Sequence, residues 1–190
     1  MNIKIVCIGK LKEKYWRDAA EEYIKRLSAY AKIQIVELKE SRSDDIEEEG
    51  GRILAALGVS EGLIKSSKNT GRGNTDPGHN NGSILSKTDK ALIGKMKGEI
   101  KDHIITLEIQ GRALSSEQLA EKMENLGIEG KSNVAFVIGG SCGISRAVSS
   151  IADMKLSFSK MTFPHQMMRV ILLEQIYRSF KISRNESYHK

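Results

Sequence analysis

The stretch NVAFVIGGSCG, residues 133–143, joins a strand pattern to a turn that is rich in glycine. Its first six residues are nearly all apolar, which is typical of a central strand in a parallel sheet that is buried on both faces. Ligands in open α/β sheets bind beyond the carboxyl ends of the strands, and glycines let the backbone approach a ligand closely. The turn matches neither the GxGxxG pattern nor a phosphate-binding loop with its lysine, so a plain tight turn remains the alternative.

The segments on either side of this stretch alternate between strand and helix patterns. Apolar residues recur at every second position in the expected strands and at helical spacing in the expected helices. We expect strands at 2–8, 32–38, 103–109, 133–138 and 154–158, and helices at about 14–28, 45–57, 115–125, 145–152 and 165–182. This alternation predicts one α/β domain with a mainly parallel sheet flanked by helices.

Residues 58–93 interrupt this alternation. Within them, residues 66–83 read SSKNTGRGNTDPGHNNGS, a run of mostly small polar residues and glycine. Such a segment cannot bury enough apolar surface to offset the entropy of ordering it. We therefore expect a mobile insertion in a single domain that spans residues 1–190, with some helix around 87–97.

The composition narrows the class of protein. The chain is 39% hydrophobic and 28% charged, with a formal net charge of +6, which permits binding to a polyanion. No apolar run approaches the roughly 18 to 20 residues of a membrane helix, and the first residues lack the pattern of a signal peptide. Cys7 and Cys142 lack the spacing of a zinc site or a disulfide framework. We therefore expect no metal, no membrane segment and a cytoplasmic location.

A second candidate site is LSFSKMTFPH, residues 156–165. Pro164 suits the first turn of the helix that follows, so an ordinary strand-to-helix loop is one interpretation. The loop also combines large apolar side chains with hydroxyls and backbone groups. An adenine-like ring is bound by that mixture of apolar walls and a few fixed polar contacts.

The last helix and the tail form a third candidate. Apolar residues cover most of the circumference of the helix between 167 and 180, which indicates either a subunit interface or a deep core helix. Beyond them, basic charge gathers at one end of the chain. This cluster is either solvated charge or a phosphate-binding patch, and it consists of Arg178, Lys181, Arg184, His189 and Lys190.

Five motifs together resemble one protein family. They are KLKEKYW at 10–16, ITLEIQG at 105–111, FVIGGS at 136–141, LSFSKMTFPHQMMR at 156–169 and the terminal YHK. These motifs are similar to those of the RlmH (YbeA) family, pseudouridine N3-methyltransferases of 23S rRNA within the SPOUT class. The resemblance covers nearly the whole chain outside the insertion, which the usual shorter members lack.

The resemblance implies a SPOUT fold whose C-terminal part forms a trefoil knot, assembled as a homodimer. It implies that S-adenosylmethionine binds in the knot, without a metal, and that the substrate is helix 69 of 23S rRNA in the assembled 70S ribosome. Carried over by motif, the cofactor contacts are Leu107, Gly139, Phe158, Ser159, Lys160, Met161, Thr162 and Phe163.

The acceptor N3–H is a weakly acidic imide that must lose its proton, and a histidine with a near-neutral pKa is the natural base. We assign this role to His189. Arg178 and Arg184 are expected to hold RNA phosphate or the developing imide charge, and Tyr188 to stack on a base. We expect Lys181 and Lys190 to contact RNA as well, whereas His165 is interpreted as a residue that positions the start of its helix. The alternatives are a SPOUT enzyme for another RNA site and a ribosome-binding module without activity.

Overall fold

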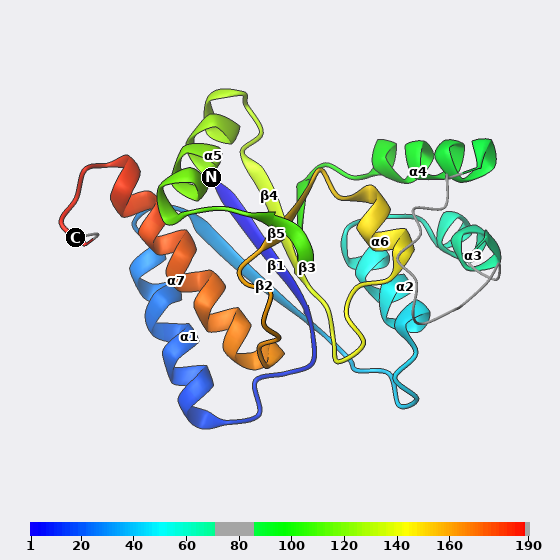
Figure 1. Cartoon of the computed structure of the whole chain (residues 1–190), viewed down its shortest axis with the longest axis horizontal. Helices are drawn as coiled ribbons and strands as arrows, with labels where there is room; N and C mark the ends of the chain where they lie inside the picture. Colours follow the sequence, from blue (N-terminus) through cyan, green and yellow to red (C-terminus); the bar gives the residue numbers. More distant parts are fainter. Residues whose placement is uncertain (71–85, 189–190) are drawn as a thin grey trace.

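The computed structural model describes residues 1–70 and 86–188, and in them the strands form one parallel sheet (Figure 1). The order across the sheet is β2-β1-β4-β3-β5. The bounds are β1 Asn2–Ile8, β2 Lys32–Leu38, β3 His103–Ala113, β4 Asn133–Ile138 and β5 Met154–Ser157. The expected α/β class with a parallel sheet is confirmed. The trefoil knot stays a prediction, because strand order and pairing do not report how the chain is threaded.

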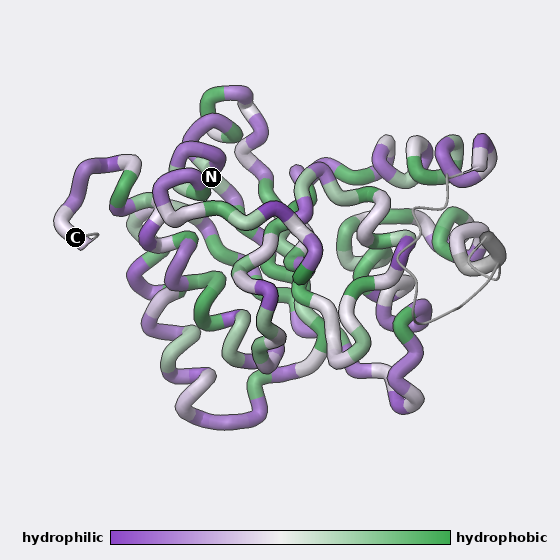
Figure 2. The backbone as a smooth tube through the Cα atoms, viewed as in Figure 1, coloured by the Kyte–Doolittle hydropathy of each residue, from purple (hydrophilic) through white to green (hydrophobic). Residues whose placement is uncertain are grey.

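Helices cover both faces of the sheet (Figure 1). One face carries α1 (Lys14–Leu27), α5 (Ser116–Ile128) and α7 (His165–Ser183), and the other carries α2 (Ile46–Ala56) and α6 (Arg146–Ile151). The apolar residues of β4 divide between the two cores, with Phe136 in the first and Ala135 and Val137 in the second. Apolar segments of the tube in Figure 2 gather accordingly on the strands and the inner sides of the helices. Burial on both faces explains why β4 lacks a polar alternation.

The region expected as an insertion contains two described helices, α3 (Glu61–Thr70) and α4 (Lys87–Glu99). Within this region, the sequence pattern predicted a helix only around residues 87–97. The structure adds α3 because a few well-spaced apolar residues are enough to extend the second core, and Val59, Ile64 and Met96 are buried there. Residues 71–85 lie outside the described residues, so the mobility of this region stays a prediction.

Helix α7 packs between α1 and α5, and Leu172, Leu173 and Ile176 are fully buried there. The core-helix interpretation therefore holds for this part of α7. None of the helices in the described ranges is both long and apolar enough to cross a bilayer.

A buried arginine near the start of α7 ties this helix to two strand ends. Arg169 is 0% exposed, and its guanidinium donates to the Glu37 carboxylate near the end of β2 and, at 3.0 Å, to the carbonyl of Gly9 after β1. The same Glu37 oxygen accepts the Leu11 amide at 3.2 Å. The first turns of α7 are thus fixed at the carboxyl edge of the sheet.

We expect Arg169→Ala to lower the free energy of unfolding by about 3–5 kcal/mol, because it leaves the facing carboxylate without its partner and opens a cavity. Urea unfolding followed by circular dichroism measures the change. Arg26→Ala removes an exposed ion pair on α1 instead and should change stability little. If both variants lost the same free energy of unfolding, the burial of Arg169 would not be what makes this residue important for stability.

Candidate functional site

A cavity of about 660 Å³ lies at the carboxyl ends of β3, β4 and β5. Its walls come from the end of β3, the glycine loop after β4, the loop after β5 and the first turn of α7. The volume is in the range of small-molecule and cofactor sites. The two segments that the sequence singled out, 139–143 and 158–163, therefore form parts of one site.

The glycine loop is packed so tightly that it leaves no room for a side chain at Gly139. A Cβ atom there would lie 2.1 Å from the carbonyl oxygen of Gly143. A Cβ atom on Gly140 would lie 2.6 Å from a carboxylate oxygen of Glu49. Gly143 has a φ of +87°, which side-chain-bearing residues rarely adopt. The backbone itself therefore forms this wall of the cavity.

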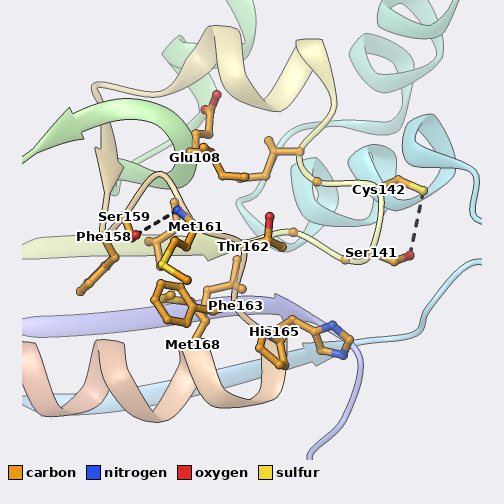
Figure 3. Close-up of a pocket in the computed structure, with 18 of the residues that line it drawn as sticks. Glu108, Ser141, Cys142, Phe158, Ser159, Met161, Thr162, Phe163, His165 and Met168 are labelled. Carbon is orange, nitrogen blue, oxygen red and sulfur yellow. Dashed lines mark hydrogen bonds between the residues drawn. The ribbon is translucent and has the colours of Figure 1, made fainter. Parts of the chain in front are cut away.

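The opposite wall is a loop that its own hydroxyls hold in shape. The hydroxyl of Ser157 lies 3.0 Å from the carbonyl of Ile109 and 3.1 Å from that of Ser159. The Met161 amide donates to the Ser159 hydroxyl at 2.9 Å. In Figure 3, Met161 lies on one side of the site and Cys142 on the other, with Thr162 between them. This wall combines apolar surface with a few polar groups.

Most of the predicted cofactor contacts line this cavity. They are Leu107, Gly139, Phe158, Ser159, Met161, Thr162 and Phe163. Lys160 is exposed and does not contribute to the lining. Their proximity supports a common ligand, and their contacts with a cofactor stay predictions.

The structure adds residues that sequence analysis did not assign to the site. Glu108, Cys142 and Met168 line the cavity, and so does His165, which was interpreted only as a helix-start residue. The Nε2 atom of His165 lies 3.8 Å from the Glu40 carboxylate. The signal that could have found Glu108 is its place just after the buried segment of β3, where ligand-facing groups in α/β sheets gather.

Two of the predicted catalytic residues, Arg178 and Tyr188, lie at the other end of α7. Thirteen residues separate His165 from Arg178, which corresponds to about 20 Å along a helix. Arg178 donates to Glu174 at 2.6 Å, and its guanidinium lies 4.9 Å from the ring centre of Tyr188. Within one chain, the structure therefore does not bring these residues to the cavity. His189 and Lys190 lie outside the described residues.

The polar groups at this end of α7 are held by one another. The Tyr188 hydroxyl donates to Glu174 at 3.2 Å, Lys181 pairs with Glu186, and the Arg184 guanidinium lies over the ring of Tyr30 at 4.6 Å. Burial, followed by hydrogen bonding with Tyr23, raises the pKa of Tyr188 above its ordinary value. Tyr188 is therefore a neutral phenol near pH 7, suited to stacking or donating rather than to accepting a proton.

Comparison with known proteins gives the family. A family model described as "Predicted SPOUT methyltransferase" matches residues 1–76 and 64–189. The chain belongs to the SPOUT methyltransferase family. The two matched segments overlap at residues 64–76, a range that contains the end of α3 and the first residues that the structure does not describe.

Curated relatives of this SPOUT methyltransferase match over the full length of both chains. The ribosomal RNA large subunit methyltransferase H of Clostridium novyi is 44% identical, and that of Clostridium perfringens is 40% identical. A putative ribosomal RNA large subunit methyltransferase H of Methanococcus maripaludis is 44% identical. Membership of a methyltransferase family makes this chain an enzyme. Among the described residues, no group of His, Cys, Asp or Glu is arranged to hold a metal ion.

We expect Gly139→Ala to weaken the binding of S-adenosylmethionine at least about tenfold, because the added methyl group must displace the backbone at Gly143 and distort the wall. Isothermal titration calorimetry measures the affinity. Gly62→Ala is the matched control, since a Cβ atom there meets nothing within 4 Å. An unchanged affinity in the Gly139 variant would place the methyl donor elsewhere.

Proposed function

We propose that this protein transfers the methyl group of S-adenosylmethionine to N3 of a pseudouridine in helix 69 of 23S rRNA, in the assembled ribosome and hence in the cytoplasm. The observation that carries the proposal is the joint cavity of the glycine loop and the loop after β5. The names of the relatives support an rRNA substrate, and the motifs at 105–111, 136–141 and 156–169 support the choice of site.

The residues of the cavity fit the proposed methyl donor. Apolar side chains of Leu107, Phe158 and Phe163 offer surfaces for an adenine ring, and the backbone of Gly139, which also lines the cavity, offers polar groups beside them. The Thr162 hydroxyl adds a further polar group at the centre of the site (Figure 3). When bound, the cofactor supplies a sulfonium methyl group that is already electrophilic, so this chemistry requires no metal.

The chain's own residues must orient the acceptor and remove its proton. We assign proton removal to His189, which follows Tyr188 directly, and the binding of RNA phosphate or of the developing imide charge to Arg178 and Arg184. Lys181 and Lys190 add to this cationic end of the chain. Orientation of the two reactants contributes a large part of the acceleration.

The length of α7 supports a contribution of these groups from a second copy of the chain. The cavity lies at the start of the helix, and the tail follows its end, about 28 Å further on. We therefore propose a homodimer in which the tail of each subunit completes the cavity of the other. Arg178 and Arg184 would then act at the methyl donor of the other subunit, although both lie far from the cavity of their own chain.

His189→Ala should lower the rate of methyl transfer to ribosomes at least about 100-fold, because a general base is lost. Transfer of labelled methyl groups at saturating cofactor measures the rate. The affinity for S-adenosylmethionine should not change. Raising the pH should restore part of the rate, because the imide then ionises without a base. A wild-type rate in the variant would refute this assignment.

Mixing two variants tests the shared site, with the cofactor kept at a concentration too low to occupy the cavity of Gly139→Ala chains. Gly139→Ala chains lack an intact cavity, and His189→Ala chains lack the base. After subunit exchange, about half of the dimers are mixed and each holds one intact site, so about a quarter of the wild-type activity should return. No recovery after verified exchange would show that each tail serves its own chain.

The site of methylation separates this proposal from its alternatives. Ribosomes with and without the pseudouridine are offered as substrates, and mass spectrometry locates the methylated nucleotide. Methylation at another nucleotide would indicate a SPOUT enzyme with a different RNA target. Ribosome binding without any methyl transfer would indicate a non-catalytic module.

A further inference from the structure

Helix α4 carries a row of lysines on the side that faces away from the core. Lys87, Lys90 and Lys97 are three and seven residues apart, which places them on one side of a helix. All three are exposed, whereas Met96 on the opposite side is buried. Figure 1 shows α4 at the outer edge of the molecule, beyond α6.

The carboxylates near this lysine row are engaged in holding the fold. Asp89 belongs to the capping box at the start of α4, with Ser86. Glu99 accepts the backbone amide of Ser60 at 2.6 Å. Asp153 accepts both the Lys97 ammonium group at 2.9 Å and the amide of Ile104 at 2.8 Å. Asp153 therefore neutralises Lys97, whereas Asp89 and Glu99 stabilise a helix start and a loop and leave Lys87 and Lys90 without an ion pair among the described residues.

Several lysines in this region are left with uncompensated charge. In the described parts of the chain, Lys87, Lys90 and Lys101 form no ion pair. Some exposed cations on other helices are paired with a neighbour one turn away, such as Lys65 with Glu61 on α3 and Arg26 with Glu22 on α1. Pairs of this kind are typical of a merely solvated helix surface, and the lysine row departs from that pattern.

A second cavity lies next to the end of the lysine row, at the amino ends of β3 and β4, and Lys97 belongs to both. Its volume is about 560 Å³, and Lys97, Lys101 and Lys131 contribute to its lining. The carboxylate of Asp102, also in the lining, is paired with Lys4 at 2.6 Å. Lys97 and Lys131 are paired with Asp153 and Glu129, whereas Lys101 forms no ion pair among the described residues. The result is a concave surface beside the row with a surplus cation in its wall, distinct from the cavity at the carboxyl ends of the strands.

We propose that the lysine row and this second cavity bind the phosphate backbone of RNA. This inference rests on the RNA substrate proposed above, and it assigns a role to part of the insertion. From Lys87 to Lys97 the row spans about 15 Å along the helix, so it is long enough to contact more than one phosphate of an RNA strand. Lysines act on phosphate as flexible point charges, so the contact positions the RNA without reading its sequence.

The test compares two double charge reversals. Lys87→Glu with Lys90→Glu alters the row, and Lys32→Glu with Lys39→Glu alters exposed lysines at the two ends of β2, the opposite edge of the sheet. The net charge of the two proteins is the same. Fluorescence anisotropy with a labelled RNA hairpin, at 50 to 200 mM salt, gives the affinity and its salt dependence. Circular dichroism verifies the fold of both variants.

The row variant should bind the hairpin at least about tenfold more weakly than the control at the lowest salt. A plot of log affinity against log salt has a negative slope, and this slope should become less steep by about one to two, since two phosphate contacts are lost. Lys87→Gln with Lys90→Gln should show a smaller loss in the same direction. Cofactor affinity should stay at the wild-type value in all variants.

Equal RNA affinities and slopes in the row variant and the control would overturn the proposal. A loss seen with ribosomes but not with the hairpin would also contradict it, because it would indicate an acidic protein as the partner. Failure of the wild type to methylate ribosomes would refute the proposed function but not the RNA-binding role of the lysine row. The hairpin comparison would still decide whether the row binds RNA.

Discussion

The ion pair of the buried Arg169 with Glu37 is the contact on which the geometry of the candidate site depends. It joins the start of α7 to Glu37 on β2 and to the carbonyl of Gly9 after β1. His165 and Met168, which line the cavity, are on the same turns of the helix. A charged group without solvent must keep its partners, because an unpaired charge in the interior is very costly. The helix start, and with it one wall of the cavity, is thereby held in one position.

Helix α7 links two groups of residues that differ in chemistry. Its start contributes apolar and backbone surface to the cavity, and its end gathers cations around an aromatic cluster of Tyr30, Tyr177, Phe180 and Tyr188. A rigid helix cannot bring its own two ends together. The same rigidity makes it suitable for presenting one end to a second chain while the other end is packed in its own core.

The sequence predicted the sheet and both loops of the cavity because their causes are local. An all-apolar strand, a glycine-rich turn and a proline after a hydroxyl-rich loop are patterns of neighbouring residues. Burial of Arg169 could not be predicted in this way, since its partners lie 132 and 160 positions away. Helix α3 was missed because its apolar residues are few and are covered only by the tertiary packing of α2 and α4. The separation of the tail from the cavity likewise depends on where a long helix is docked.

The surplus of positive charge and the apolar cavity lie in different parts of the molecule. The cavity at the carboxyl edge has mainly apolar walls, and the carboxylate of Glu108 at its side already accepts the hydroxyls of Thr106 and Ser149. Such a site discriminates by shape and by a few fixed polar contacts. The surplus cations lie away from it, on α4 and beyond the end of α7. Phosphate contacts at a distance can orient a large RNA without competing for the cavity that we propose for the methyl donor, because backbone contacts position a nucleic acid and do not need to touch the reacting base.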